Sequence, residues 1–176
     1  GAASLVALAG CDKLTQSSWF PSILHKAEGL TERAQRAVTP ASAMAKEYGE
    51  EDISNVFPAN GNTDPGTEEY AVMVKNDFAD WQVLIDGLVT TPTMFSLGAI
   101  KEMPARTQIT RHDCVEGWSA IGKWTGIPLK LLLDAAGLKS QARFLVFHCA
   151  DKMGFGTPYY ESIDLIDAFH PQTILA

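Results

Sequence analysis

The sequence predicts one α+β domain that follows an N-terminal extension. At 176 residues the chain is long enough for one ordinary hydrophobic core and too short for two. Short segments rich in β-branched and alternating apolar residues, typical of strands, lie among amphipathic segments typical of helices. Hydrophobic residues make up 46% of the chain, as in globular proteins. The net charge of -7 argues against a general affinity for nucleic acid or for an anionic membrane.

The first ten residues are small and apolar, and the run ends at Cys11. It is too short to span a bilayer, which needs about 20 apolar residues, and is typical of the end of a secretory signal. Residues 8–11, Leu-Ala-Gly-Cys, also resemble the lipobox at which bacterial lipoproteins are acylated, so Cys11 is a candidate lipid anchor. An apolar first helix or a disordered leader is the alternative. Because no initiator Met or basic region precedes the run, we expect the true N-terminus to lie upstream.

Residues 12–66 form the rest of the expected N-terminal extension, built of helices and turns. The better helical candidate is 30–46, which Thr31 could cap and which Pro40 should break or restart. Residues 54–66 are dense in Asn, Gly and Pro, so they are expected to be mostly turns.

The candidate domain, residues 67–176, alternates between the two kinds of segment. Strands are expected at 71–74, 82–85 and 107–110, with a fully buried strand at 144–148. Helices are expected at 93–102, 128–137 and 163–169. Gly87 should close a turn after the second strand, and Gly137 suits the end of the second helix.

Cys114 lies in the string 110–119, Thr-Arg-His-Asp-Cys-Val-Glu-Gly-Trp-Ser, just after an expected strand. A loop at a strand's end is where a scaffold often presents a reactive group. Arg111, His112 and Lys123 could stabilise the thiolate and so lower the pKa of Cys114. On this chemistry alone, Cys114 could be a soft metal ligand, a redox-active thiol or a small buried hydrophobe.

The chain has three cysteines, Cys11, Cys114 and Cys149. An odd number excludes a fully paired disulfide framework within the chain, and the spacing of the last two is not that of a zinc site. A disulfide between Cys114 and Cys149 would conflict with a metal-ligand role for Cys114. The two interpretations therefore exclude each other in the active form.

Two long strings resemble one known family. Arg111-His112-x-Cys114-Val115-Glu116-Gly117-Trp118-Ser119, followed by Trp124-Thr125-Gly126-Ile127-Pro128, resembles the metal-binding segment of the sulfite oxidase family of molybdenum enzymes. The resemblance is closest to the branch of periplasmic protein-methionine-sulfoxide reductase catalytic subunits. The second string is Tyr159-Tyr160-Glu161-Ser162-Ile163-Asp164, leading to residues 170–176. The similarity extends from about residue 55 to the last residue.

The resemblance implies a sulfite-oxidase-type molybdopterin-binding domain with mixed β-sheets over residues 67–176. It also implies mononuclear molybdenum bound to molybdopterin, with Cys114 as the protein ligand and the dithiolene of the pterin as the other sulfur donor. Because family members continue into segments that contact the pterin phosphate, we expect the domain to be incomplete at its C-terminal end.

The resemblance also suggests roles for other residues. Asn60 with Gly61 would contact the pterin, and Cys149 would lie near the cofactor. Tyr159 and Tyr160 would flank the active site, where Arg111 and His112 could position substrate or deliver a proton. Trp118 and Trp124 would wall the pocket or pack in the core, and Glu116 would orient Arg111 or Lys123 through an ion pair.

The function implied is two-electron oxygen-atom transfer, with reduction of a sulfoxide or N-oxide favoured. The protein would be periplasmic or exported, and a membrane haem protein would supply electrons. Two alternatives stay open: a thiol-redox protein that uses Cys114 and Cys149, and a non-catalytic exported lipoprotein that keeps the fold without metal.

Overall fold

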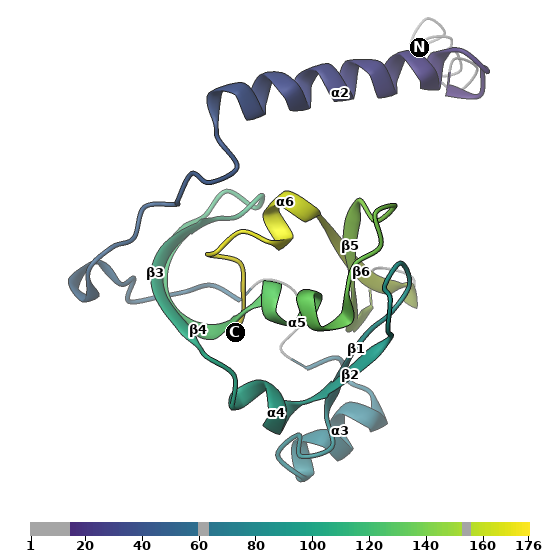
Figure 1. Cartoon of the computed structure of the whole chain (residues 1–176). Helices are drawn as coiled ribbons and strands as arrows, with labels where there is room; N and C mark the ends of the chain where they lie inside the picture. Colours follow the sequence, from purple (N-terminus) through teal and green to yellow (C-terminus); the bar gives the residue numbers. More distant parts are fainter. Residues whose placement is uncertain (1–14, 60–63, 153–155) are drawn as a thin grey trace, which may run out of the picture. The chain divides into compact units, whose positions relative to one another are not determined.

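The computed structural model describes residues 15–59, 64–152 and 156–176 (Figure 1). The chain divides into two compact units, residues 1–43 and residues 44–176. Cys11, Asn60 and Gly61, which the sequence singles out, lie outside the described residues. A domain boundary at residue 66 stays a prediction.

The first unit contains the helix α2 (Phe20–Val38), which begins ten residues before the expected helix 30–46. Pro21 fits its first turn, where no backbone N–H is needed. Thr31 does not cap the helix, as expected, but lies inside it and donates its hydroxyl to the Ala27 carbonyl at 3.0 Å. The helix ends before Pro40, because a residue preceding proline disfavours helical backbone. No helix of the described residues is long and apolar enough to cross a membrane.

The second unit is an α+β arrangement, which confirms the predicted class (Figure 1). Its elements are η1 (Glu50–Asp52), α3 (Glu68–Lys75), β1 (Gln82–Ile85), β2 (Thr93–Ser96), α4 (Leu97–Lys101), β3 (Arg106–Asp113), β4 (Ser119–Pro128), α5 (Leu129–Ala136), β5 (Phe144–Lys152), β6 (Pro158–Asp164), α6 (Leu165–Ala168) and β7 (Ile174–Leu175). The strands form the sheets β1-β2, β3-β4-β7 and β5-β6. All their pairs are antiparallel, in place of the mixed sheets expected from the sequence.

Two elements differ in type from the prediction because of capping residues. The expected strand 71–74 is part of α3, where the Thr67 side chain accepts a hydrogen bond from the Tyr70 N–H at 3.2 Å. Glu68 and Glu69 in the first turn also favour a helix start there. The expected helix 93–102 is instead β2 followed by the short α4, which Ser96 caps. Local capping therefore outweighs the β-branched composition in the first case and delays the helix in the second.

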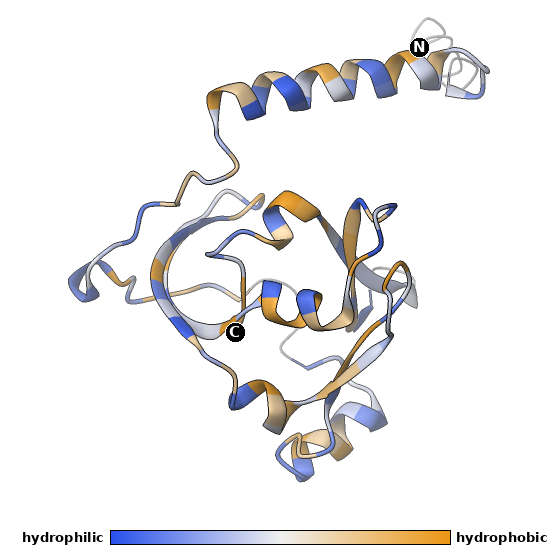
Figure 2. Ribbon diagram, in the orientation of Figure 1, coloured by the Kyte–Doolittle hydropathy of each residue, from blue (hydrophilic) through white to orange (hydrophobic). Residues whose placement is uncertain are grey.

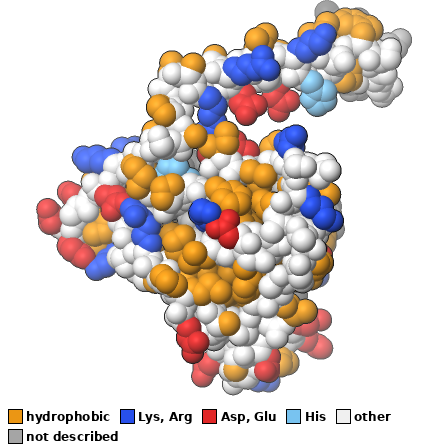
Figure 3. Space-filling view, in the orientation of Figure 1, with side chains coloured by type: hydrophobic (Ala, Val, Ile, Leu, Met, Phe, Trp, Pro, Cys, Tyr) orange, Lys and Arg blue, Asp and Glu red, His pale blue; other side chains and the backbone are white. Residues whose placement is uncertain are grey.

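The core of the second unit is built around α5. Leu132 and Leu133 have no exposed surface, and they belong to one cluster with Ile85, Phe95 and Ile127 of the neighbouring strands. Apolar and polar residues lie on different sides of α5, as its sequence predicts (Figure 2). Apolar side chains also reach the surface around α5 and α6 (Figure 3), where Leu131 and Ile166 are partly exposed.

The expected buried strand 144–148 is a strand, but it is not buried. Leu145 and Phe147 pack against the core, whereas Phe144 is 67% exposed and Val146 is 46% exposed. The two-stranded β5-β6 sheet packs only one face on the core, so alternate side chains point to solvent. A continuous apolar run does not distinguish this case from a strand covered on both faces.

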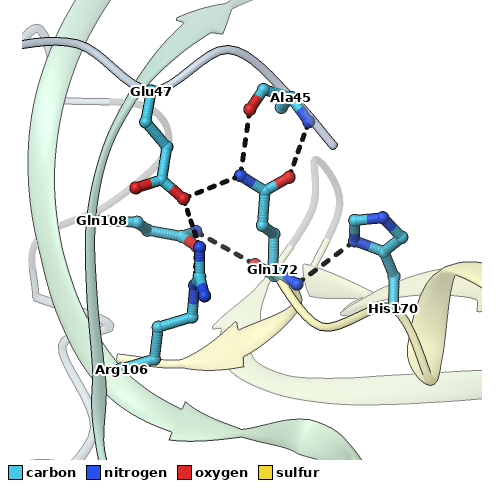
Figure 4. A network of polar contacts seen from close by, with 6 residues as sticks. All are labelled: Ala45, Glu47, Arg106, Gln108, His170 and Gln172. Atoms are coloured by element: carbon cyan, nitrogen blue, oxygen red, sulfur yellow. Dashed lines mark hydrogen bonds and ion pairs between the residues drawn. The ribbon is translucent and has the colours of Figure 1, made fainter. Parts of the chain in front are cut away.

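A polar network joins three distant parts of the second unit (Figure 4). The Gln172 side chain donates to and accepts from the backbone of Ala45, at 3.0 and 2.6 Å, and donates to Glu47. Glu47 also pairs with Arg106 of β3. Gln108 of β3 donates to the Gln172 carbonyl at 3.0 Å. The start of the unit, β3 and the segment after α6 are therefore held together by side-chain amides and one ion pair.

Candidate functional site

Cys114 sits in the turn of the β3-β4 hairpin, as predicted. The last paired residues are Asp113 and Ser119. Beyond them the Cys114 N–H donates to the Trp118 carbonyl at 2.9 Å, and the Gly117 N–H donates to the Cys114 carbonyl at 3.0 Å. Gly117 has a φ of 88°, a conformation that favours glycine. The thiol is free and half-buried, so the turn presents one cysteine in a fixed backbone frame.

The register of the hairpin sorts the motif onto two faces. His112 lies opposite Ala120, and Thr110 lies opposite Gly122, so these residues share one face. Arg111 lies opposite Ile121 on the other face. The sequence placed Arg111 and His112 together beside Cys114, but neighbouring residues of a strand point in opposite directions. The two side chains therefore have different surroundings.

Arg111 belongs to a polar cluster on its face of the hairpin. It pairs with Asp113 at 2.7 Å and donates to the Ser119 hydroxyl at 3.2 Å, while Ser119 donates to Asp113. The Ser119 hydrogen bond first, and Arg111 second, hold the pKa of Asp113 below its ordinary 3.8. Arg111 is therefore engaged within the hairpin.

The other expected ion pairs differ as well. Lys123 pairs with Glu50 of η1. Glu116 was expected to orient Arg111 or Lys123, and this is wrong for the described contacts, because Glu116 accepts a hydrogen bond from Trp118 Nε1 at 3.2 Å. The nearer partner in the turn, two residues away, takes the carboxylate.

An aromatic cluster covers the His112 face of the hairpin. The Phe57 ring makes edge-to-face contacts with His112, Trp118 and Trp124, with centroids 5.6, 5.7 and 5.3 Å apart. His112 and Trp124 are also neighbours, with centroids 5.0 Å apart. The two tryptophans thus pack on the hairpin beside the Cys114 turn.

Phe57 is the site-adjacent residue that sequence reasoning missed. It lies in the stretch 54–66, which was assigned to turns because of its Asn, Gly and Pro content. The only sequence signal was a large aromatic side chain next to Pro58 in an otherwise polar stretch. Such a side chain needs a packing partner, but the sequence does not say that the partner lies more than 50 residues away.

The segment 44–59, here called the wrapping segment, lies along both edges of the hairpin. The Tyr48 N–H donates to the Ile109 carbonyl of β3 at 2.9 Å. The Ser54 N–H donates to the Ile121 carbonyl of β4 at 3.0 Å, and the Ile121 N–H donates to Ser54 Oγ at 2.9 Å. Between these points Glu50 pairs with Lys123. The hairpin that carries Cys114 is therefore contacted at both edges and on both faces.

The tyrosine pair lies on β6, in the other hairpin. Tyr159 is half-buried and donates its hydroxyl to Glu161, and this hydrogen bond is the main reason that the pKa of Tyr159 is raised above 10.0. Tyr160 is 58% exposed and lies opposite His148. Cys149 is a free, exposed thiol on β5, where the register shifts between His148 and Lys152. No hydrogen bond, ion pair or ring contact found among the described residues joins this hairpin to the Cys114 turn.

The donor set indicates what kind of metal site Cys114 could join. The described part of the chain contains no group of three or more His, Cys, Asp or Glu side chains placed to hold a metal. A metal at Cys114 would therefore take most of its ligands from a non-protein group. A single half-buried thiol in a rigid turn fits a molybdenum whose other sulfur ligands come from a pterin dithiolene.

Comparisons with known proteins agree with this chemistry. The family model of the oxidoreductase molybdopterin binding domain matches residues 70–176. The putative protein-methionine-sulfoxide reductase subunit YedZ1 of Azospira oryzae is 34% identical over 168 residues, which are 96% of this chain and 60% of that protein. The protein-methionine-sulfoxide reductase catalytic subunit MsrP of Campylobacter jejuni is 32% identical over 108 residues, 55% of this chain and 36% of that protein.

Two further relatives complete the picture. MsrP of Ralstonia nicotianae is 35% identical over 105 residues, 54% of this chain and 32% of that protein. Among solved structures, the sulfane dehydrogenase SoxCD from Paracoccus pantotrophus superposes with a TM-score of 0.43 at 18% identity, over 52% of this chain and 27% of that chain. The chain spans 60% of the length of YedZ1 and about a third of the two MsrP proteins.

The matched region 70–176 is more than half of the chain. It contains the β3-β4 hairpin with Cys114 and the β6 strand with the tyrosine pair. The chain therefore belongs to the oxidoreductase molybdopterin-binding domain family, of the sulfite oxidase type.

Proposed function

We propose that this chain is part of a molybdenum-molybdopterin oxidoreductase that reduces a sulfoxide or N-oxide, with Cys114 as the protein ligand of the metal. The observation that carries the proposal is the single free, half-buried thiol held by two backbone hydrogen bonds in the β3-β4 turn. The names of the relatives, protein-methionine-sulfoxide reductases, favour reduction of a sulfoxide.

The bound cofactor supplies two-electron oxygen-atom transfer, and the chain supplies orientation and access. Cys114 would bind the metal through its thiolate. His112, packed between Phe57 and Trp124, has a fixed position two residues away, from which it could hold a proton or a polar substrate group. Arg111 would act less directly, since Asp113 and Ser119 already engage its guanidinium.

The tyrosine pair contributes a phenolic O–H to the proposed site. Tyr159 already donates its hydroxyl to Glu161, whereas Tyr160 is 58% exposed and has no hydrogen-bond partner among the described residues. Tyr160 is therefore the better candidate for a substrate contact. Asn60 and Gly61 stay candidates for pterin contact, and Cys149 for a position near the cofactor.

Three further proposals follow from the family resemblance. The protein would act in the periplasm or otherwise outside the cytoplasm, and a membrane haem protein would supply its electrons. Cys11 stays a candidate for lipid attachment. A small molecule with an oxo group would be the substrate, consistent with the sulfoxide named in the relatives.

The test is metal analysis of the full-length protein, produced in a host that makes the cofactor. We expect near-stoichiometric molybdenum and a thiolate-to-metal absorption band, both lost or altered in Cys114→Ser. Cys149→Ser is the matched control, because it removes the other free thiol of the described residues, and it should leave metal and band unchanged. Reduction of a methyl sulfoxide with an artificial electron donor should then depend on Cys114.

A folded wild-type protein without molybdenum would overturn the proposal and leave the thiol-redox alternative to be tested. Loss of metal in Cys149→Ser, with Cys114→Ser unaffected, would move the ligand assignment to the β5-β6 hairpin.

A further inference from the structure

We propose that Phe57 is a positioning residue for Cys114. Its ring packs on the face of the β3-β4 hairpin that precedes the turn, and this packing sets the direction in which the thiol is presented. The inference deepens the proposed metal-ligand role of Cys114, but the packing itself does not depend on a metal.

The contacts of Phe57 lie on both strands of the hairpin. His112 is at the end of β3, two residues before Cys114, and Trp118 accepts the Cys114 N–H hydrogen bond through its carbonyl. One ring therefore touches the residues that flank the cysteine on both sides of the turn. A ring that bridges both strands resists opening of the turn, because splaying the strands would break edge-to-face contacts with each.

Gly122 provides the space that Phe57 occupies. A Cβ on Gly122 would lie 3.0 Å from Phe57 Cε2 and 2.9 Å from Trp124 Nε1, both tighter than ordinary contact. The absence of a side chain at this position of β4 is thus what lets the ring lie flat against the hairpin. The sequence pattern Gly122-x-Trp124 and the distant Phe57 form one packing unit.

Trp124 supplies a second observation. Its Nε1 is buried without a hydrogen-bond partner among the described residues. The same point above Gly122 is close to both this nitrogen and Phe57 Cε2, so the indole N–H lies at the Phe57 ring. An aromatic ring is a weak acceptor for N–H and keeps water away from the donor. Removing the ring would leave that donor to water.

The wrapping segment holds Phe57 in place from the other side. Ser54, three residues earlier, makes two hydrogen bonds with Ile121 of β4. Phe57 is 38% exposed, so one side of its ring faces solvent and the other faces the hairpin. Its neighbour Val56 is 73% exposed and offers a matched control from the same segment.

The experiment measures the reactivity of the Cys114 thiol in the metal-free full-length protein. Cys11→Ser and Cys149→Ser leave Cys114 as the only cysteine of this chain, and iodoacetamide, an uncharged reagent, reports access to it. We expect Phe57→Ala to raise the alkylation rate about tenfold, as for a turn whose closed form loses about 1.4 kcal/mol. Phe57→Leu should give a smaller increase, and Val56→Ala should match the parent.

Two spectroscopic readouts accompany the rate. Tryptophan emission should shift to longer wavelength in Phe57→Ala, because Trp118 and Trp124 gain contact with water, and should stay unchanged in Val56→Ala. In the molybdenum-loaded protein, the thiolate-to-metal absorption band should shift in Phe57→Ala and be partly restored in Phe57→Leu. A residue with a merely structural role would lower the melting temperature without moving that band.

Parental alkylation and emission in folded Phe57→Ala would overturn the proposal, as would equal effects in Val56→Ala. If Phe57→Ala does not fold, Phe57→Leu decides: a parental rate and band contradict the proposal. Wild-type protein that binds no molybdenum would overturn the proposed function alone, since the alkylation result is independent of metal.

Discussion

The β3-β4 and β5-β6 hairpins are both antiparallel and both carry candidate site residues, but they are held very differently. β3-β4 is contacted at both edges by the wrapping segment, pairs further with β7, and has an aromatic cluster on one face. β5-β6 pairs with no third strand of the described residues, and one of its faces leaves Phe144 and Tyr160 exposed.

The difference shows how a fold can separate rigidity from access. A metal ligand needs a fixed direction, and Cys114 lies in the hairpin with the most neighbours. A residue that meets substrate needs exposure, and Tyr160 lies in the hairpin with an open face. Residues held in several ways at once lose less order on binding, which is the physical advantage of a preorganised ligand.

The largest effect is expected where another segment lies directly against β4. A Cβ on Gly126 would overlap the backbone carbonyl of Leu175 in β7, which cannot rotate away as a side chain does. Gly126→Ala should therefore lower the free energy of unfolding by about 3 kcal/mol in urea denaturation. Gly98→Ala in α4 is the control, because nothing lies within 4 Å of its Cβ position. Equal losses in the two variants would contradict the enclosed position of β4.

The second effect concerns the two thiols. Cys149 is exposed on the open hairpin, and Cys114 is half-buried in the enclosed one. In the metal-free protein, Cys149 should react with iodoacetamide roughly fivefold faster, because access favours it. Mass spectrometry of the modified peptides at short times measures the ratio. Faster modification of Cys114 would show that thiolate character, and not burial, controls this pair.

The third effect is a pH dependence of the enclosed hairpin at low pH. The pKa of Asp113 is held below 3.8 by Ser119 and Arg111, so the folded state favours the carboxylate. The stabilisation is present above pH 3.8 and is lost as pH falls through the lowered folded value. Ser119→Ala should bring the Asp113 pKa back toward 3.8, as followed by carboxyl NMR. Ser162→Ala, an exposed serine of β6, should leave it unchanged.

The smallest effect is the mirror case on the open hairpin at high pH. The pKa of Tyr159 is raised above 10.0, chiefly by the hydrogen bond to Glu161, so the folded state favours the neutral phenol. This contribution is present below pH 10.0 and is lost as pH rises through the raised value. Ultraviolet titration of tyrosinate should show a late step that disappears in Tyr159→Phe and moves down in Glu161→Gln. A late step that persists in Tyr159→Phe would assign it to another tyrosine.

Local patterns predicted the parts of the site that depend on near neighbours. The strand before Cys114, the turn that presents it and the helix α5 with Gly137 at its end all follow from residues a few positions apart. Capping by Thr67 and Ser96 could also have been found locally, but the β-branched residues at 71–74 and the expected helix start at 93 outweighed it.

Other features could not be predicted in this way. The exposure of Phe144 and Val146 depends on which elements cover each face of β5, and no local pattern reports that. Phe57 is placed by contacts with residues 55 to 67 positions later in the chain.

The sequence by itself determined the family, the cysteine that is a candidate metal ligand and the hairpin turn that presents it. These properties depend on motif chemistry and on backbone preferences that act within a few residues. Only the tertiary structure decided that Arg111 and His112 have separate surroundings, that Phe57 packs beside the Cys114 turn and that the tyrosine hairpin has an open face. Those outcomes require segments far apart in the chain to meet, and the energy of such contacts belongs to no single stretch of sequence.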